Sequence, residues 1–231
     1  TQARADIFAL NIIKPQMLYS KTLAIEERIN ADGTIIIPLN IEKTKEILQK
    51  QFNNGLRSVA ILFMHSYKYP AHEQAVAKCA KEIGYTQIST SHKTSPLIKY
   101  IPRGDTTVID AYLSPILHHY TSQIANKLNI NSSNTNSPNI DLTFMTSSGG
   151  LTSYDNFDGK DAILSGPAGG IVGAAQTAAN AGINKILCFD MGGTSTDVAH
   201  FAGNYDVSFE TEIAGHRLQS PMLHIHTVAA G

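Results

Sequence analysis

Hydrophobic and polar residues follow an α/β pattern over the first hundred positions. Asp32-Gly33 separates two short runs rich in Ile and Thr, which predicts a β-hairpin. Apolar spacings of three and four, with Asn40 as an N-cap, predict amphipathic helices. The continuous apolar run 59–63 predicts a strand buried on both faces. The predicted elements are strands at 22–29, 34–37, 59–63 and 86–89, and helices at 41–52 and 71–83.

The pattern changes in the second half of the chain. Helical spacing extends over 105–128, where the internal Pro115 predicts a kink or two separate helices. The Asn- and Ser-rich tract 129–139 predicts an exposed loop. A Gly- and Ala-rich helix follows, up to Ala181, and its small side chains favour close packing. The predicted strands are 140–145, 162–164, 185–190 as a buried strand, 197–201, 205–213 and 223–228.

Charge and composition exclude several classes of protein. The 231 residues carry 18 Lys and Arg against 19 Asp and Glu, a balance that argues against nucleic-acid or anionic-membrane partners. No apolar run reaches the ~18 residues of a membrane-spanning helix, and no secretory leader is visible. Cys79 and Cys188 are interpreted as reduced core residues. Because neither Thr1 nor Gly231 looks like a natural terminus, we expect a piece of a longer, cytoplasmic protein.

The sharpest chemical feature is the run from Cys188 to Asp197. An apolar strand ends in Asp190, a Gly192-Gly193 turn follows, and three hydroxyl residues precede Asp197. Glycines allow a tight turn whose amides face phosphate oxygens, hydroxyls add donors, and Mg²⁺ prefers oxygen ligands. The run therefore predicts a phosphate-binding hairpin, with a plain capped hairpin as the alternative. The candidate phosphate contacts are Gly192, Gly193, Thr194, Ser195 and Thr196, and the candidate Mg²⁺ ligands and catalytic carboxylates are Asp190 and Asp197.

A second glycine-rich stretch, 165–173, leads into the small-residue helix. A glycine-rich turn at a helix N-terminus is an anion site in principle, which makes Gly169 and Gly170 candidate phosphate contacts. The alternative is that these glycines serve only close helix packing. Ala168 breaks the G-x-G-x-x-G pattern of a dinucleotide site, and the chain has no G-x-x-x-x-G-K-[S/T] loop.

His224 and His226 form a third candidate. Residues two apart on a strand share a face, so both imidazoles could reach one metal ion. Two ligands do not complete a site, and ordinary strand positions are the alternative. A second divalent metal near His226 is the weakest of the three predictions.

The chain resembles the hydantoinase A/5-oxoprolinase family of actin-like ATPases over nearly its whole length. Ile101–Thr106 favours the 5-oxoprolinase branch within that family, although Asp105 and His224 depart from residues common there. The segments that carry the resemblance are Ile13–Pro15, Leu18–Tyr19, Glu26–Arg28, His65–Tyr67, His72–Gln74, Asp110–Pro115, Ser147–Leu151, Ser165–Gly173, Phe189–Asp197 and Ile225–Gly231.

The resemblance implies ribonuclease-H-like α/β lobes that clamp ATP, with 1–100 ending one lobe and 101–231 opening the central domain. It implies ATP- and Mg²⁺-dependent opening of 5-oxo-L-proline to L-glutamate. The alternatives are a hydantoinase or ketone-carboxylase subunit and a non-catalytic binding domain. The implied partners are the lactam, the rest of the parent chain or a hydantoinase B-type subunit, in an oligomer. One phosphate hairpin is half of the clamp, so we expect the 231 residues alone to be inactive.

Overall fold

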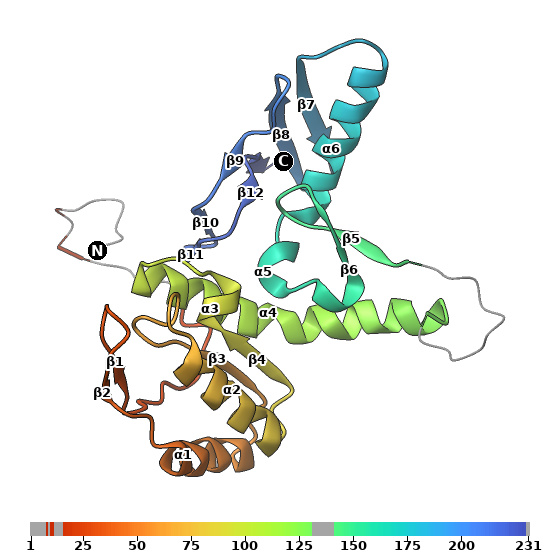
Figure 1. The fold of residues 1–231 in the computed structure, drawn as a ribbon. Helices are drawn as coiled ribbons and strands as arrows, with labels where there is room; N and C mark the ends of the chain where they lie inside the picture. Colours follow the sequence, from red (N-terminus) through yellow and green to blue (C-terminus); the bar gives the residue numbers. More distant parts are fainter. Residues whose placement is uncertain (1–7, 9, 12–15, 131–140, 230–231) are drawn as a thin grey trace.

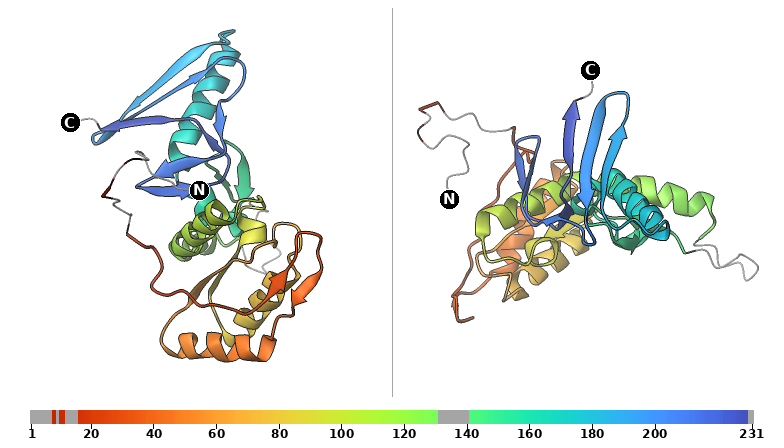
Figure 2. Two further views of the ribbon diagram at one scale, coloured as in Figure 1. Left: turned by 90° about the vertical axis from the view of Figure 1, so that its left-hand side faces the viewer. Right: turned by 90° about the horizontal axis from the view of Figure 1, so that it is seen from above.

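The long helix α4 (Tyr100–Lys127) separates two α/β halves of the molecule (Figure 1). A computed structural model describes residues 8, 10–11, 16–130 and 141–229; most of the loop predicted at 129–139 lies outside them. The first half contains the paired strands β1 and β2, helices α1 and α2, and strands β3 and β4. The second half packs on the opposite side of α4, as the left view of Figure 2 also shows. The predicted α/β class is confirmed.

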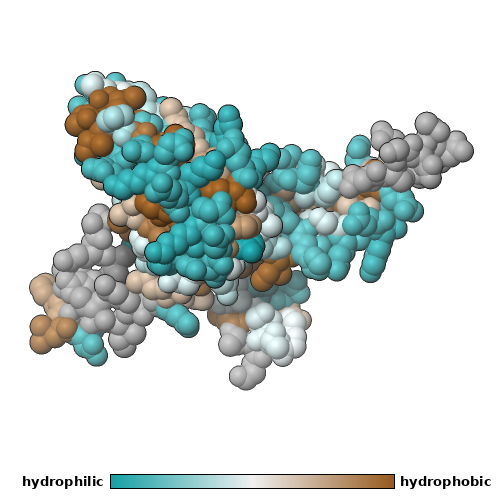
Figure 3. Space-filling model, turned by 90° about the horizontal axis from the view of Figure 1, so that it is seen from below, coloured by the Kyte–Doolittle hydropathy of each residue, from teal (hydrophilic) through white to brown (hydrophobic). Residues whose placement is uncertain are grey.

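Two parallel strands form the centre of the first half. β3 (Ser58–Ile61) and β4 (Gln87–Thr90) are parallel, and a cluster of apolar side chains packs them against α1 (Ile41–Asn53) and α2 (Ala71–Ile83). The predicted hairpin is also present, as the antiparallel pair β1 (Arg28–Ile29) and β2 (Ile35–Ile37). The buried members of the cluster are Leu48, Ile61, Val76, Cys79, Ala80 and Tyr85. The outward side of this layer is mainly hydrophilic, with separate hydrophobic patches (Figure 3).

The sequence prediction for β3 was partly wrong. The strand ends at Ile61 rather than at residue 63, and within it only Ile61 is fully buried. The reason is that β4 covers one edge of β3, whereas no other strand of the described residues pairs with the second edge. A two-stranded parallel sheet therefore leaves apolar positions half-covered, although parallel sheets are usually enclosed on both faces.

Helix α1 begins where the sequence predicts. The Asn40 side-chain Oδ1 accepts a hydrogen bond from the Lys43 backbone N–H at 3.0 Å. Replacing Asn40 with alanine leaves that amide without its cap, so we expect a loss of about 1 kcal/mol in the free energy of unfolding. Urea denaturation measures the loss, with Lys45→Ala, at an exposed position of the same helix, as the control. An unchanged midpoint would show that the cap contributes nothing.

Pro115 does not divide the long helix. α4 is one helix from Tyr100 to Lys127, with Pro115 inside it. Because proline has no N–H, the carbonyl of Ala111, four residues earlier, lacks its helical donor. The Ser58 hydroxyl donates to that carbonyl at 2.6 Å. The proline thus leaves the Ala111 carbonyl free to accept this bond, which joins α4 to the start of β3.

Buried charges fasten α4 to the first half. Arg103 has a fully buried side chain, and its guanidinium donates to the carbonyls of Phe63 at 2.6 Å, Met64 at 2.9 Å and Leu97 at 3.3 Å. Burial lowers the pKa of Arg103, and the charge of Glu73 opposes that shift. Glu73 is also fully buried. These contacts bring three parts of the fold to one point: the segment after β3, helix α2, and the residues that lead into α4.

Glu73 satisfies four donors in the same region. Its carboxylate accepts from the Phe63 N–H at 3.0 Å, the Ser91 hydroxyl at 2.5 Å, and both the backbone N–H and Nδ1 of His92, at 3.0 and 2.7 Å. A buried carboxylate requires this degree of pairing to remain stable. Glu73 therefore holds the carboxyl ends of β3 and β4 together, a role that the sequence analysis did not assign.

The second half differs from several predictions. Residues 162–164 are not a strand: Ala162 ends helix α5 (Gly159–Ala162) and a turn follows. The N–H groups of Gly159 and Lys160 bond to Ser114 Oγ and Asp110 Oδ1 of α4, at 2.9 and 3.2 Å. Those two acceptors satisfy the free amides of a helix start, which the local sequence could not reveal.

Two longer predicted strands are interrupted. The region 205–213 contains β9 (Val207–Ser208) and β10 (Thr211–Ile213), and 223–228 is divided between β12 (Met222–Leu223) and β13 (His226–Ala229). The remaining elements are α3 (Ser91–Thr94), β5 (Thr143–Met145), β6 (Leu151–Ser153), η1 (Tyr154–Asn156), α6 (Ser165–Asn180), β7 (Ile186–Met191), β8 (Ser195–Phe201) and β11 (His216–Leu218).

The main sheet of the second half has the order β13–β8–β7, and α6 packs against it. Cys188 and Ala199 face the helix together with its buried Ala168 and Ile171. The prediction of a fully buried strand at 185–190 was wrong, because the alternate residues Leu187 and Phe189 are 82% and 69% exposed. Both cysteines are free, as expected, but only Cys79 is fully buried.

Candidate functional site

The predicted phosphate-binding run forms an antiparallel hairpin. β7 and β8 pair from Ile186↔Phe201 to Met191↔Thr196, and the turn between them contains Gly192, Gly193 and Thr194. The Gly192 N–H donates to the Ser195 carbonyl at 2.9 Å, which closes the turn. All three turn residues are exposed, and of their backbone amides only that of Gly192 is used in closing the turn.

Asp190 and Asp197 lie directly opposite each other across this hairpin. Like charges at facing positions of an antiparallel pair destabilise the sheet. The Asp197 Oδ1 accepts a hydrogen bond of 2.6 Å from the Thr227 hydroxyl of β13, which fixes that carboxylate. A divalent cation between these carboxylates and a phosphate would offset their repulsion.

Thr227 is a residue that the sequence analysis did not select. β13 pairs with β8 so that Thr227 faces Asp197. The register of two strands separated by some thirty residues places them together, and no local motif carries that information. The only available signal was the position of Thr227 in a segment that resembles the family.

Helix α6 lies beside the hairpin with its first turns near Asp190. A Cβ placed on Gly170 would lie 3.9 Å from the Asp190 Oδ2, so α6 approaches the Asp190 carboxylate at Gly170. The chain runs up α6 and back along β7, which brings the end of β7 to the helix N-terminus. Free amides and the helix dipole at that end favour an anion.

The glycines at the hairpin and at α6 border open space. A Cβ on Gly193 or on Gly166 would meet no atom within 4 Å, and neither Gly192 nor Gly193 has a positive φ. The conformation of the turn therefore does not itself require glycine. The space beside it is free for a group that approaches the backbone closely. Close packing in α6 comes instead from Ala168 and Ala175, which are buried.

Two of the predicted site residues lie on the other face of the sheet. Thr196 is 4% exposed and alternates with Asp197, so its side chain points away from the two carboxylates. His226 pairs with Val198 and stacks edgewise on His224 with ring centroids 4.6 Å apart. The His224 Nδ1 lies 3.2 Å from Asp206 Oδ2. In the described part of the chain, no group of three or more His, Cys, Asp or Glu residues could hold a metal.

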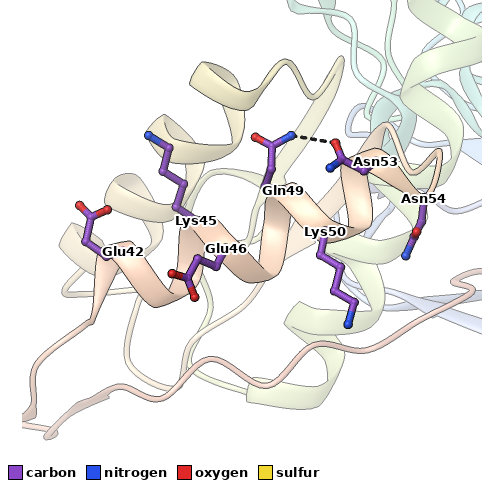
Figure 4. Close-up of a pocket in the computed structure, with 7 residues that line it drawn as sticks. All are labelled: Glu42, Lys45, Glu46, Gln49, Lys50, Asn53 and Asn54. Atoms are coloured by element: carbon purple, nitrogen blue, oxygen red, sulfur yellow. Dashed lines mark hydrogen bonds between the residues drawn. The ribbon is translucent and has the colours of Figure 1, made fainter.

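The polar outer face of α1 borders a shallow depression. Six side chains of α1 and that of Asn54, which follows the helix, border it, and they fan outward toward solvent rather than converging (Figure 4). Gln49 Nε2 donates to Asn53 Oδ1 at 3.0 Å along the helix. We interpret this surface as a solvated helix face. Among the described residues, no helix is long and apolar enough to cross a membrane.

Asp105 is a partly buried carboxylate of α4. Burial raises the pKa of its carboxyl, while Arg217 and His216 of β11 oppose the shift. Because the pKa of this carboxyl is higher in the folded state than in the unfolded state, its ionisation destabilises the fold. The cost is complete once the pH exceeds the folded-state pKa and is absent below the unfolded-state pKa. We expect Asp105→Asn to raise the melting temperature near pH 7 by about 1–3 °C. Melting curves should converge toward pH 3, and a constant difference would contradict this account.

Sequence comparison identifies the class of protein. The profile described as Hydantoinase/oxoprolinase matches residues 103–231, and that of the Hydantoinase/oxoprolinase N-terminal region matches residues 1–84. The first match alone covers more than half of the chain. The chain belongs to the hydantoinase/oxoprolinase family.

The individual relatives of the chain include named enzymes. The chain is 40% identical to a 5-oxoprolinase of Dictyostelium discoideum and 39% identical to 5-oxoprolinase 1 of Arabidopsis thaliana, over its whole length. It spans 21% and 19% of those two proteins. The beta subunit of acetone carboxylase from Xanthobacter autotrophicus is 27% identical over 91% of the chain.

Two solved structures share the fold. A nucleotide-free acetone carboxylase and an ATP-dependent caprolactamase from Pseudomonas jessenii each superpose with a TM-score of 0.76 and 27% identity. Each superposition covers 90% of this chain, but only 29% and 30% of the other. The chain thus spans about a fifth of the length of the two curated 5-oxoprolinases and less than a third of each solved structure.

Proposed function

We propose that this chain is part of a longer polypeptide that opens 5-oxo-L-proline to L-glutamate with hydrolysis of ATP to ADP and phosphate. The observation that carries the proposal is the facing pair Asp190 and Asp197 beside an exposed Gly-Gly-Thr turn with open space next to it. The identity of 40% to a 5-oxoprolinase favours this lactam as the substrate.

The chemistry of the proposed reaction explains why a nucleotide is needed. Amide resonance makes a five-membered lactam unreactive toward water. Transfer of a phosphoryl group to the carbonyl oxygen makes the carbon electrophilic. One water then adds to that carbon and the C–N bond breaks, with a proton going to the nitrogen, which leaves an acyl phosphate. A second water hydrolyses the acyl phosphate to the carboxylate and releases phosphate. ATP supplies the phosphoryl group, and Mg²⁺ supplies positive charge for its oxygens.

The residues of this chain would hold that phosphoryl group. The backbone amides of Gly193 and Thr194 in the exposed turn would donate to phosphate oxygens, while the Gly192 amide closes the turn on the Ser195 carbonyl. Asp190 and Asp197 would orient Mg²⁺ and its waters, with Thr227 fixing the Asp197 carboxylate. Gly169 and Gly170 of α6 would allow the phosphate to approach the helix N-terminus. Such preorganised groups usually provide the largest share of catalysis in phosphoryl transfer.

A second candidate is a hydantoinase or ketone-carboxylase type of subunit. The specific observation in its favour is the likeness to acetone carboxylase, in sequence and in structure. The site described here would activate a substrate oxygen by phosphorylation in either case. The lower identity, 27% against 40%, places this candidate second.

We propose a division of labour within the parent protein. Residues 1–100 would end one lobe of the ATP clamp, and residues 101–231 would open the next, with cytoplasmic location and oligomeric assembly as further expectations. One phosphate hairpin supplies half of the contacts, so the 231 residues alone should show little or no ATP turnover. Robust Mg²⁺-dependent turnover by them would contradict this division.

The test uses the purified parent protein with a panel of cyclic amides. We expect ATP hydrolysis to depend on 5-oxo-L-proline, with equimolar formation of L-glutamate, and to be absent with hydantoin or acetone. Phosphate release and glutamate are measured together, and the assay without lactam is the control. Turnover with hydantoins but not with 5-oxo-L-proline would assign the second candidate. No substrate-dependent turnover and no nucleotide binding would leave a non-catalytic domain.

A further inference from the structure

Ser147 joins four segments of the second half. It lies in the turn between β5 and β6, and it is 1% exposed. Its hydroxyl donates to the Asp161 carbonyl at 2.7 Å and accepts from the Leu164 N–H at 2.9 Å. Its backbone N–H also donates to the Asp161 carbonyl, at 2.7 Å, and its carbonyl accepts from the Leu223 N–H at 2.8 Å. One buried serine therefore connects this turn to α5, to the residue before α6 and to β12.

Leu164 is the residue from which helix α6 starts. It is the N-cap of α6, and its carbonyl accepts the first helical hydrogen bond, from the Ala168 N–H at 3.0 Å. A leucine side chain has no oxygen that could cap a helix. In a capping box the N–H of the N-cap residue is satisfied by a side chain of the helix itself. Here the Ser147 hydroxyl takes that N–H instead, so a remote segment anchors the start of α6.

The turn that carries Ser147 is packed tightly against α6. Gly149 has a φ of +83°, and a Cβ placed on it would lie 3.2 Å from side-chain atoms of both Leu223 and Val172. On the strand before the turn, the Met145 side chain lies 3.6 Å from a Cβ placed on Gly169. A turn with so little free space holds Ser147 at a fixed place beside the first turns of α6.

Helix α5 connects Ser147 to the first half of the molecule. The Gly159 N–H donates to Ser114 Oγ at 2.9 Å, and that hydroxyl donates to Asp110 Oδ1 at 3.2 Å. The Ser89 hydroxyl of β4 donates to Asp110 Oδ2 at 2.6 Å, and all three of these polar side chains are buried. A path of hydrogen bonds and helix backbone therefore runs from β4 through α4 and α5 to Ser147 and the start of α6.

We propose that Ser147 is a positioning residue for the phosphate-binding site: through Leu164 it sets the start of α6 beside the hairpin of Asp190 and Asp197. The inference rests on the proposed function only for the binding of Mg-ATP at this site. Ser147 would not touch the phosphate itself, because its side chain is buried. Binding groups must be held rigidly to be effective, and a misplacement of about 1 Å can cost about 100-fold in rate.

The experiment compares Ser147→Ala with Ser148→Ala in the parent protein. Ser148 is the exposed neighbour, and its hydroxyl lies 2.8 Å from that of Thr146. We expect Ser147→Ala to speed amide hydrogen exchange at Leu164 and to weaken Mg-ATP binding, each by about 10-fold or more, because a buried N–H loses its acceptor. The Ala168 amide should stay protected, which shows that α6 remains folded. Ser148→Ala should change neither quantity by more than about twofold.

A second variant separates hydrogen bonding from packing. Ser147→Cys fills the same space but offers sulfur, a weak acceptor, so Mg-ATP affinity should fall by an amount between those of the wild type and Ser147→Ala. Wild-type affinity in Ser147→Cys would assign the residue to packing alone and overturn the proposal. Unchanged exchange at Leu164 in Ser147→Ala would also overturn it, as would faster exchange with unchanged Mg-ATP affinity. If Ser147→Ala does not fold, the cysteine variant decides by the same measurements.

These measurements are independent of the lactam. A parent protein that binds Mg-ATP but opens no lactam would contradict the proposed substrate and leave the test of Ser147 intact. Wild-type Mg-ATP affinity and full turnover of 5-oxo-L-proline in Ser147→Ala would overturn the inference and leave the reaction. A wild-type parent protein that binds no Mg-ATP would overturn both.

Discussion

Asp190→Asn in the parent protein is expected to lower 5-oxo-L-proline-dependent ATP turnover by about 100-fold or more. Asparagine has nearly the same shape as aspartate but carries no charge, so the hairpin keeps its fold while losing one of the two carboxylates that would orient Mg²⁺ and its waters. The initial rate of phosphate release at saturating Mg-ATP measures the effect. The loss should fall mainly on kcat, because the carboxylate acts most strongly on the charge of the transferred group.

Asp206→Asn is the matched control for this change. Asp206 is an exposed carboxylate of the same half, and its side chain contacts His224 rather than the hairpin. We expect turnover within about twofold of the wild type, as for most surface substitutions. If Asp190→Asn behaved in the same way as this control, the hairpin would have no role in catalysis and the proposed site would be wrong.

Arg103→Met is the substitution with the largest expected effect on stability. The fully buried guanidinium serves three carbonyls, and methionine keeps much of its apolar volume but supplies no donor. Each buried carbonyl left without a donor costs about 1–3 kcal/mol, partly offset because burying the charge is itself unfavourable. We expect the free energy of unfolding to fall by about 3 kcal/mol or more, measured by urea denaturation of the 231-residue chain.

Arg28→Met provides the comparison for Arg103. Arg28 lies on β1 with an exposed side chain, so the same chemical change should cost no more than about 0.5 kcal/mol. A loss below about 1 kcal/mol for Arg103→Met would mean that water or side-chain movement replaces its hydrogen bonds. In that case α4 would not depend on this contact for its attachment to the first half.

The accuracy of the sequence predictions follows from the range of the interactions involved. Asn40 and the start of α1 were predicted correctly, because an N-cap and a helical period are contained within a few residues. The hairpin of Asp190 and Asp197 was also located, because a strand, a Gly-Gly turn and a second strand are contiguous. The α5 helix was missed, because its first amides bond to side chains of α4 about 45–50 residues earlier in the chain.

The sequence by itself determined the α/β order, the starts of α1 and α2 and the phosphate-binding candidate, since each depends on spacing and side-chain chemistry within one segment. The tertiary structure decided which candidates share a face: it joined Thr227 to Asp197 and placed Thr196 and His226 on the opposite side of the sheet. It also decided that Glu73 and Arg103 are buried among distant partners. The physical reason is that strand register and the burial of charge depend on contacts between remote segments, which exist only once the chain has folded.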